Sequence, residues 1–492
     1  MAPQDRTDEQ AQPLWTAGEV LAATGGRWAA RAVPADTPIT GVSIDSRTLA
    51  AGNLFFALAG PTHDGHDHVA KALAAGAAAA VVHRVPAALP ADAALILVDD
   101  TMAALEALGA AARARTAARF VAVTGSVGKT GTKEALRLAH EEQAPTYATP
   151  GNLNNQWGVP LSLARMPRDT VYGIFELGMN HAGEISALTR QVRPDVAVIT
   201  TVEPAHLEFF GSVAAIADAK AEIFEGMGPA GVAVLNRDNA QYDRLVGKAK
   251  TQGLTRIVGF GRHPAAQARL NDCSLHATCS AVTATIQGET LDYCIGAPGL
   301  HWVMNSLAVL AAVKALGADV GAAASRFAKL TPPKGRGQRR RIALAEGALY
   351  MIDESYNASP AAMRAAIAVL AQATTSPGGR RIAVLGDMRE LGAAAAQLHA
   401  ELAPDLVAAK VDLVFTAGPL SAALAAALPA ERRGVHAEDT TALAPSVAAA
   451  VKPGDVVLVK GSLGSRMSVI VEALAALDRV EGANMPRAAN GN

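Results

Sequence analysis

The sequence predicts an α/β protein built from several domains, and three observations support this prediction. Short apolar runs typical of buried strands alternate with helical patterns along most of the chain, which favours mostly parallel sheets. The 492 residues exceed what one hydrophobic core accommodates, so about two to four domains are expected. Half of the residues are apolar, which is enough to bury large cores.

The composition argues against several classes of protein. With 44 basic and 45 acidic side chains the formal net charge is −1, which indicates neither a nucleic-acid partner nor attraction to an anionic membrane. No apolar run reaches the roughly 18 residues that a membrane-spanning helix requires. Met1–Gln12 is polar and lacks the apolar core of a signal peptide, and three cysteines suit a reducing compartment. We therefore expect a cytoplasmic protein without membrane insertion.

The first hundred residues are expected to form a small α/β unit. Its strand-like runs are Ile39–Ile44, Asn53–Leu58, Ala79–Val82 and Leu95–Val98, and its helical pattern is His68–Ala75. Asp45-Ser46-Arg47 follows the first run, and its hydroxyl and guanidinium donors could bind a sugar diphosphate. The same residues suit an ordinary turn, and their spacing alone favours the turn.

The next motif, T-G-S-V-G-K-T, predicts a phosphate-binding loop. It follows the buried-strand pattern Phe120–Val123 and precedes the helical pattern Thr132–Leu138. Glycines let backbone N–H groups close around phosphate oxygens, and the helix N-terminus adds partial positive charge. Val123 stands where the common motif has a glycine, so this is a shorter variant. The predicted phosphate-binding residues are Thr124, Gly125, Ser126, Val127, Gly128, Lys129 and Thr130. Within the loop the lysine would reach the outer phosphates, and the last hydroxyl would hold Mg²⁺.

Polar side chains follow the next predicted strands. The loop Thr149–Gly158 is dense in amides, which can recognise a polar ligand as donors and acceptors. The strand Val171–Phe175 delivers Glu176, and the strand Asp195–Thr201 is followed by His206. With the loop hydroxyl, these two side chains form a plausible Mg²⁺ ligand set, although a histidine after a strand is more often structural.

Residues 217–341 are expected to form two helices with an antiparallel ribbon between them, followed by a linker. Ala217–Met227 predicts a helix on which Lys220 is interpreted as an ordinary solvated lysine. Residues 271–296 alternate as in an antiparallel ribbon, and Trp302–Leu316 is strongly helical. Pro332–Arg341 is rich in proline, glycine and arginine, which is typical of an interdomain linker. A guanidinium from this segment beside the nucleotide could stabilise a transferring phosphate.

The last third alternates cleanly between strand and helix. Expected strands are Ala348–Ile352, Ile382–Leu385, Leu413–Phe415 and Val456–Val459, and expected helices include Pro360–Leu370 and Ser468–Leu477. This order implies a mostly parallel sheet with right-handed crossovers. There is no G-x-G-x-x-G motif, so dinucleotide binding is not supported.

Several motifs in this order resemble the Mur ligases, and within that family the branch that handles D-alanyl-D-alanine. The motifs are Asp45–Arg47 with Gly52–Leu58, Thr124–Thr130, Gly151–Asn155, Glu176–Asn180, Ala205–Glu208, Ala219–Phe224, Asp353–Ala358, Gly386–Gly392 and Lys460–Ser462. The resemblance runs from about residue 38 to residue 477. It implies a smaller N-terminal α/β domain (1–115) that binds UDP, and a central P-loop-type ATPase domain (116–337) with a mostly parallel sheet. It also implies a C-terminal Rossmann-like α/β domain (338–492) that helps to seat D-alanyl-D-alanine.

The resemblance also implies roles for individual residues. ATP would be bound by the loop Thr124–Thr130, by Asn305 at adenine, by Arg336 at the phosphates and by Asp353 or Glu354 at the ribose. Mg²⁺ would be held by Thr130, Glu176 and His206, and Lys220 falls where many relatives have a carbamylated lysine that binds a second Mg²⁺. Catalysis would rest on Lys129, Glu176, His206 and Lys220. The substrates would contact Ser46, Arg47, Asn152, Asn154, Asn155 and Asn357.

The implied reaction is ATP-dependent addition of D-alanyl-D-alanine to UDP-N-acetylmuramoyl-tripeptide through an acyl phosphate, in peptidoglycan synthesis. We expect ATP and Mg²⁺ as cofactors, no nucleic-acid partner and a monomeric enzyme. Two alternatives stay open. The near one is another amino-acid ligase of the Mur and folylpolyglutamate synthase group, which the motifs after residue 350 disfavour. The other is a P-loop NTPase that couples hydrolysis to motion.

Overall fold

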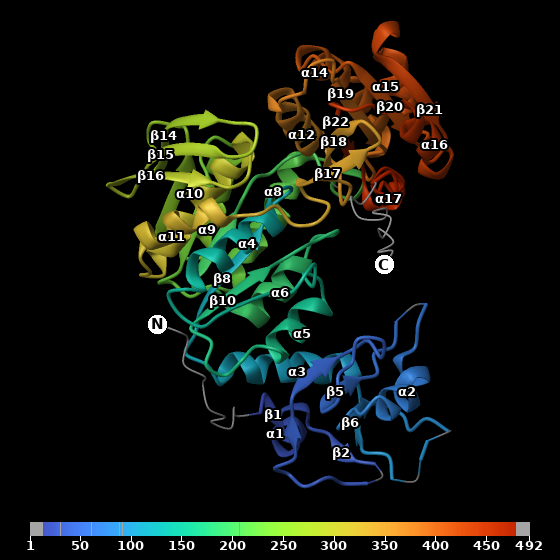
Figure 1. Cartoon of the computed structure of the whole chain (residues 1–492). Helices are drawn as coiled ribbons and strands as arrows, with labels where there is room; N and C mark the ends of the chain where they lie inside the picture. Colours follow the sequence, from blue (N-terminus) through green and yellow to red (C-terminus); the bar gives the residue numbers. More distant parts are fainter. Residues whose placement is uncertain are drawn as a thin grey trace, which may run out of the picture.

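Three main sheets follow one another along the chain. The computed structural model describes residues 13–478 except residues 30, 61, 88, 91 and 206. A five-stranded, a nine-stranded and a six-stranded sheet each carry their own helices, and Figure 1 shows them stacked from the blue N-terminal part to the red C-terminal part. Pairing within the sheets is largely parallel. The predicted α/β fold class is therefore confirmed.

The N-terminal sheet has the order β2-β7-β6-β5-β4, and only β2 is antiparallel to its neighbour. Its strands are β2 (Arg27–Trp28), β4 (Gly41–Ser43), β5 (Asn53–Phe56), β6 (Ala79–Val82) and β7 (Leu95–Leu97), with helices α1 (Ala17–Thr24) and α2 (Val69–Ala74). The single strand expected over Ile39–Ile44 is wrong. β3 (Pro38–Ile39) pairs instead with β1 (Trp15–Thr16). The Thr40 N–H between the two strands donates to the carbonyl of Gly52, outside both pairings, so the chain changes sheet there.

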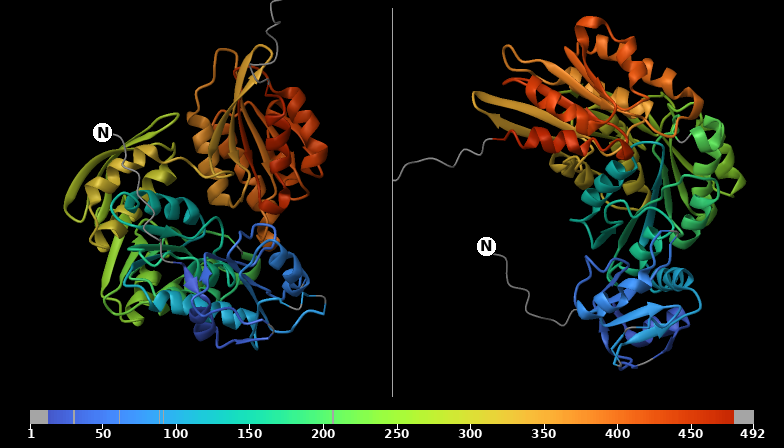
Figure 2. Two further views of the ribbon diagram at one scale, coloured as in Figure 1. Left: turned by 60° about the horizontal axis from the view of Figure 1, so that its bottom comes forward. Right: turned by 90° about the vertical axis from the view of Figure 1, so that its right-hand side faces the viewer.

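Helix α3 (Thr101–Ala114) connects this part to the central one, and Asp100 caps its first turn through the N–H groups of Met102 and Ala103. α3 packs on α5 (Gly158–Ala164) and α6 (Glu184–Val192) of the central part. Hydrogen bonds add to this packing, because the Trp15 indole donates to Ala164 O at 2.8 Å and the Arg165 guanidinium donates to Val42 O at 2.6 Å. The N-terminal sheet is thereby held against the central layer, as Figure 2 shows.

The central sheet has the order β16-β15-β14-β13-β12-β11-β8-β10-β9. Its strands are β8 (Arg119–Thr124), β9 (Thr146–Ala148), β10 (Tyr172–Glu176), β11 (Val196–Ile199), β12 (Val232–Asn236), β13 (Arg256–Gly261), β14 (Ala268–Leu275), β15 (Ser280–Ile286) and β16 (Glu289–Ile295). β8 to β14 pair in parallel, whereas β14, β15 and β16 pair antiparallel. The antiparallel ribbon predicted near residues 271–296 is thus confirmed.

Helices cover both faces of the central sheet with two separate apolar cores. One face carries α4 (Lys129–His140), α10 (Leu300–Ala315) and α11 (Val320–Arg326), and the other carries α5 (Gly158–Ala164), α6 (Glu184–Val192), α8 (Val213–Ala221) and α9 (Tyr242–Thr251). The short helix α7 (Leu207–Phe210) precedes α8. The helix expected over Ala217–Met227 continues only as a 3₁₀ turn after Ala221. Glu222 in that turn accepts hydrogen bonds from two N–H groups at the start of α6, which anchors it.

The C-terminal sheet has the order β17-β18-β22-β19-β20-β21, and only the edge strand β17 is antiparallel. Its strands are β17 (Gln338–Leu344), β18 (Gly347–Glu354), β19 (Arg381–Gly386), β20 (Leu413–Ala417), β21 (Arg433–Ala437) and β22 (Val456–Lys460). Its helices are α12 (Pro360–Gln372), α13 (Ala395–Ala400), α14 (Leu402–Ala408), α15 (Ala422–Ala427), α16 (Thr440–Ala450) and α17 (Ser468–Ala475). The predicted strand–helix alternation is confirmed here.

The predicted domain boundaries, between residues 115 and 116 and between residues 337 and 338, fall between the sheets and stay predictions. Within the part of the chain that the structure describes, no helix combines the length and apolarity needed to cross a membrane.

Candidate functional site

The predicted phosphate-binding loop lies between the buried strand β8 and helix α4. Gly128 caps the helix with φ 86°, and Gly125 has φ 150°. A Cβ at Gly125 would lie 1.9 Å from Thr200 Oγ1, and a Cβ at Gly128 would lie 2.9 Å from Asn305 Nδ2. The backbone conformation therefore favours glycine at both positions, and at Gly125 the space beside Thr200 excludes a side chain as well. The loop curls over the N-terminus of α4, as phosphate binding requires.

Neighbouring strands hold this loop in place. The Ser126 N–H donates to Thr201 O at 2.9 Å, and the Thr200 hydroxyl donates to Val127 O at 2.5 Å. The Lys129 ammonium donates to Gly125 O at 2.7 Å. Burial lowers the pKa of Lys129, the carboxylate of Glu176 opposes this shift, and Arg336 adds to it. A phosphate is the natural counter-charge for this partly buried cation.

Two of the three predicted Mg²⁺ ligands are buried near the loop, Thr130 in the first turn of α4 and Glu176 at the end of β10. Thr130 is 7% exposed and Glu176 is 1% exposed. Thr130 Oγ1 and Glu176 Oε2 are buried and have no hydrogen-bond partner, whereas Glu176 Oε1 accepts from Asn154 Nδ2 at 2.7 Å. Two unpartnered buried oxygens suit a hard cation such as Mg²⁺. The third predicted ligand, His206, lies outside the described residues.

A cavity of about 770 Å³ opens next to the loop, between the central and C-terminal sheets. Most predicted site residues line it: Ser126, Val127, Gly128, Lys129, Asn152, Asn154, Asn155, Glu176, Asn305, Arg336 and Asn357. A second hollow of about 560 Å³ lies at the starts of β8, β12 and β13 and includes none of the predicted residues. The structure thus brings together residues that lie more than 200 positions apart in the sequence.

Contacts between the central and C-terminal parts close one wall of this cavity. Asn152 Nδ2 donates to the Tyr356 hydroxyl at 2.9 Å, and the Arg336 guanidinium lies 4.1 Å from the centre of the Tyr356 ring. A cation over an aromatic face is attracted by the ring quadrupole. The amide-rich loop, the linker and the start of the C-terminal part therefore meet at one tyrosine.

The two acidic residues that end β18 occupy different places. Glu354 lines the cavity and forms an ion pair with Lys460 at 3.0 Å. Asp353 does not line it, and its carboxylate accepts hydrogen bonds from the N–H and the hydroxyl of Ser355 at 3.0 and 2.5 Å. Neighbouring side chains of a strand point to opposite faces, and this placement favours Glu354 over Asp353 as the residue that faces a nucleotide.

Lys220 is buried rather than solvated. Its side chain, on the last turn of α8, is 2% exposed. Burial, followed by the positive charge of Lys129, lowers the pKa of Lys220 well below its usual value. The interpretation of Lys220 as an ordinary surface lysine is therefore wrong, because α8 packs against the central sheet. The structure places its amine within electrostatic range of Lys129, the lysine of the predicted phosphate-binding loop.

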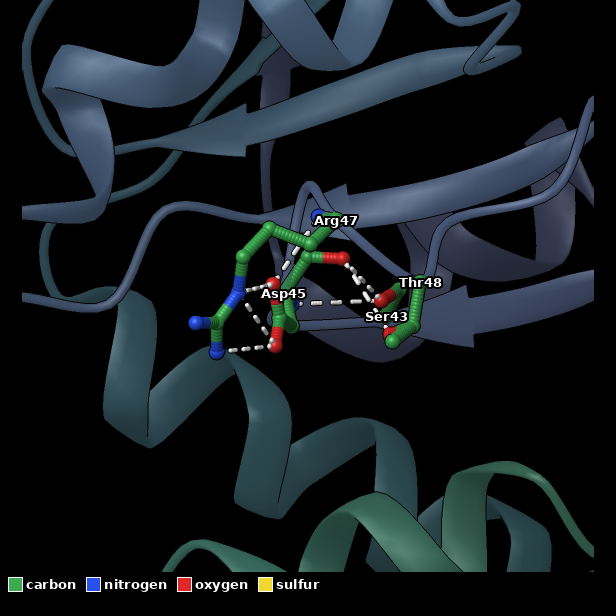
Figure 3. Close-up of polar contacts among 4 residues, drawn as sticks. All are labelled: Ser43, Asp45, Arg47 and Thr48. Atoms are coloured by element: carbon green, nitrogen blue, oxygen red, sulfur yellow. Dashed lines mark hydrogen bonds and ion pairs between the residues drawn. The ribbon is translucent and has the colours of Figure 1, made fainter.

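Ser46 and Arg47 lie apart from this cavity, after strand β4 of the N-terminal sheet. Figure 3 shows the Arg47 guanidinium paired with the carboxylate of Asp45, with contacts of 2.8 and 2.9 Å. The side-chain and backbone hydrogen bonds from Arg47 lower the pKa of Asp45 to about 2. The Arg47 side chain is 79% exposed, so it is available to a ligand at this edge.

Sequence reasoning did not single out several residues of this region, and three of them carry charge or can gain it. His181 and Glu184 line the cavity at the start of α6, and Lys133 is fully buried one turn after Lys129. The i, i+4 spacing of the two lysines places them on the same face of α4. The spacing alone gave no signal of burial, because two lysines on one face of a helix are equally typical of its solvated side.

Comparison with known proteins identifies the family. The model of the Mur ligase middle domain matches residues 123–313, that of the Mur ligase glutamate ligase domain matches residues 335–463, and that of the Mur ligase family catalytic domain matches residues 38–116. A UDP-N-acetylmuramoyl-tripeptide–D-alanyl-D-alanine ligase of Escherichia coli is 36% identical over 447 residues, covering 89% of this chain and 94% of the relative. The chain belongs to the Mur ligase family.

Other Mur ligases agree with this assignment in sequence and in structure. The UDP-N-acetylmuramoyl-tripeptide–D-alanyl-D-alanine ligase of Rickettsia prowazekii is 34% identical over 431 residues, covering 88% of this chain and 94% of the relative. MurF from Acinetobacter baumannii superimposes with a TM-score of 0.82 at 31% identity, covering 94% of this chain and 99% of that one. MurF from Thermotoga maritima, solved in complex with ADP, superimposes with a TM-score of 0.74 at 27% identity. The match covers 89% of this chain and 97% of that one. The resemblance to Mur ligases predicted from the motifs is confirmed.

Proposed function

We propose that this Mur ligase uses ATP to join D-alanyl-D-alanine to UDP-N-acetylmuramoyl-tripeptide. This is the reaction for which its relatives from Rickettsia prowazekii and Escherichia coli are named. One observation carries the proposal. A single cavity gathers the phosphate-binding lysine, a buried carboxylate with an unpartnered oxygen and an amide-rich loop, at the junction of two α/β units. The product is a UDP-linked pentapeptide, a precursor of peptidoglycan, and we propose that it is made in the cytoplasm.

The chemistry explains why ATP is needed. A carboxylate is a poor acylating agent because oxide is a poor leaving group. The substrate carboxylate attacks the γ-phosphorus of ATP, ADP leaves, and an acyl phosphate forms whose leaving group is phosphate. Lys129 and the N–H groups of the loop hold the phosphates in line and balance their charge. Asn305 lies against Gly128 and lines the same cavity, and the family resemblance assigns it to the adenine base.

Thr130 and Glu176, with His206 as the third predicted ligand, would hold Mg²⁺ through the oxygens that lack partners. When bound, the ion would supply positive charge next to the β- and γ-phosphates.

The second step is attack by the amine of D-alanyl-D-alanine on the acyl phosphate, which expels phosphate through a tetrahedral intermediate. Water competes for the same acyl carbon, so the chain has to exclude it. The wall formed by Asn152, Tyr356 and Arg336 joins the two parts on that side of the cavity. We propose that these residues help to keep the acyl phosphate dry while the dipeptide is seated.

An assay of phosphate release tests this function. Purified protein is given ATP, Mg²⁺ and UDP-N-acetylmuramoyl-tripeptide, with and without D-alanyl-D-alanine, and the products are identified by mass spectrometry. We expect phosphate release to depend on both substrates and the UDP-pentapeptide to form. Release that is indifferent to both would contradict the proposal and favour a P-loop NTPase. Release that needs another amino acid would favour a different ligase of the group.

Arg47→Ala is expected to raise the KM for the UDP-linked substrate by about tenfold, because a charge-assisted hydrogen bond to a diphosphate contributes about 1.5–3 kcal/mol before solvent screening. The KM for ATP should not change, since Arg47 lies in the N-terminal sheet, away from the cavity. Steady-state kinetics with each substrate varied in turn measures both constants. Arg84→Ala is the matched control, because Arg84 is another exposed arginine of this sheet with an aspartate partner. An equal effect of both variants would contradict a specific role for Arg47.

Lys220→Met is expected to raise the melting temperature of the ligand-free, CO₂-free protein at pH 7 by about 2 °C. The native pKa of Lys220 lies well below the unfolded value because of burial, so the unfolded state binds more protons at neutral pH. This cost fades as the pH rises toward the unfolded pKa of about 10.4. Thermal unfolding at pH 7 and pH 9 should therefore show a smaller gain at pH 9.

Lys248→Met is the control for this experiment, because Lys248 lies on the neighbouring helix α9 and forms an exposed ion pair with Asp218. Lys248→Met should not raise the melting temperature at pH 7. A lower melting temperature for Lys220→Met at pH 7 would mean that the Lys220 ammonium is stabilised in the fold. In that case Lys220 would not supply, at pH 7, the neutral amine that carbamylation requires.

A further inference from the structure

Lys133 is a buried cation whose three N–H donors all have partners. The side chain is 0% exposed and lies on α4, one turn after Lys129. Its ammonium donates to Thr149 O at 2.8 Å and to Gly151 O at 2.9 Å, and it forms an ion pair with Glu134 at 3.0 Å. An ammonium has three donors, so the set is complete. The two carbonyls flank Pro150 at the point where strand β9 passes into the amide-rich loop.

The same loop leads directly to the predicted metal ligand. Asn154 Nδ2 donates to Glu176 Oε1 at 2.7 Å, and Asn154 O accepts from the Gly178 N–H at 2.8 Å. The loop then closes tightly, because a Cβ at Gly158 would lie 2.3 Å from the carbonyl carbon of Leu153. Its outer residue Asn152 contacts Tyr356 of the C-terminal part. A shift at the start of this loop would therefore reach both Glu176 and the cavity wall.

We propose that Lys133 is a positioning residue that fixes the amide-rich loop Thr149–Gly158 relative to helix α4, so that the carboxylate of Glu176 and the UDP-linked substrate are held in register with the phosphates of ATP. This inference deepens the proposed function and rests on it. The physical basis is that one rigid helix carries two lysines on one face. Lys129 faces the phosphates, and Lys133 clamps the loop that contacts Glu176. A buried cation with two carbonyl acceptors is costly to remove, because both carbonyls then lose their charged partner.

The experiment compares three variants of the full-length enzyme. Lys133→Met keeps the length and apolar stem but removes all three donors. Lys133→Gln keeps two N–H donors on a shorter side chain, without the charge. Glu134→Gln leaves the bonds from Lys133 to the loop in place and removes the charge that pairs with Lys133 and, on its other oxygen, with Arg137. For each variant we would measure kcat and the KM of each substrate, ADP binding by calorimetry and the melting temperature.

For Lys133→Met we expect the KM for UDP-N-acetylmuramoyl-tripeptide to rise by about tenfold or kcat to fall by about as much, since a misplacement near 1 Å can cost up to about a hundredfold. ADP affinity should stay within about twofold of wild type, because the phosphate loop keeps its own contacts. Lys133→Gln should fall between Lys133→Met and wild type, and Glu134→Gln should match wild type. A purely structural lysine would instead lower the melting temperature without changing the kinetics of the folded protein.

Two outcomes would overturn the inference. One is wild-type kcat and KM for Lys133→Met, assayed at least 10 °C below its melting temperature. The other is an ADP affinity that falls in parallel with activity, which would place the effect in the phosphate loop. If Lys133→Met yields no folded protein, the kinetics of Lys133→Gln test the proposal instead. Values of kcat and KM for Lys133→Gln identical to wild type would then reject it. Failure of the wild-type enzyme to form the pentapeptide would count against the proposed function itself, not against Lys133.

Discussion

Lys129→Ala is expected to lower the rate of acyl-phosphate formation by about a thousandfold, which would make it the largest effect of any single substitution at this site. Among the residues Thr124–Thr130 of the loop, only Lys129 is positively charged. It lies at the N-terminus of α4, and its ammonium donates to Gly125 O. Without it, the negative charge that moves to the leaving ADP loses its nearest fixed counter-charge. The measurement is ADP release in a single turnover with the UDP-linked substrate present and the dipeptide absent.

The fold should tolerate this change, because the Lys129 side chain makes a single hydrogen bond within the described residues, to its own loop. The melting temperature of Lys129→Ala should therefore stay close to that of wild type. Lys314→Ala is the matched control: Lys314 also donates to a main-chain carbonyl, but it lies at the far end of α10. Ligation at the wild-type rate in Lys129→Ala would remove the basis for the phosphate-loop assignment.

Glu176→Gln is expected to lower kcat by about a hundredfold and to raise the Mg²⁺ concentration needed for half-maximal activity. The substitution keeps the size of the side chain but removes the charge from a carboxylate whose Oε2 is buried without a partner. The other oxygen can still accept from Asn154, so the loop should stay in place. Initial rates over a range of Mg²⁺ concentrations give both quantities, and ADP binding without Mg²⁺ should be unchanged.

Glu203→Gln is the control for Glu176→Gln. Glu203 lies after β11 on the same edge of the sheet, but its carboxylate already accepts a hydrogen bond from the Thr201 hydroxyl at 2.8 Å. Its Mg²⁺ dependence should match wild type. If Glu176→Gln also keeps the wild-type Mg²⁺ dependence, then Glu176 does not hold the ion, and its buried oxygen needs another explanation.

The parts of the site that could be predicted from sequence are those whose residues are neighbours in the chain. The loop Thr124–Thr130 was recognisable because its strand, glycines and helix are contiguous, so local conformation alone decides its shape. The antiparallel ribbon was recognisable for a similar reason, since alternation along β15 and β16 reports one buried face. The family resemblance supplied the remaining candidates, and seven of them line the cavity beside the loop: Asn152, Asn154, Asn155, Glu176, Asn305, Arg336 and Asn357.

The α/β class could be predicted from sequence because strands and helices have their own periodicity, and the loop of the predicted phosphate site because its residues are contiguous. Membership of the Mur ligases followed from motifs that resemble those of the family. Only the tertiary structure decided that Lys220 is buried, that Lys133 clamps the amide-rich loop, that Glu354 rather than Asp353 faces the cavity, and that the chain changes sheet at Thr40. The physical reason is the same in all four cases. Burial, the partners of a charge and the choice of sheet are set by elements distant in sequence, and the residues concerned look locally like ordinary surface or strand positions.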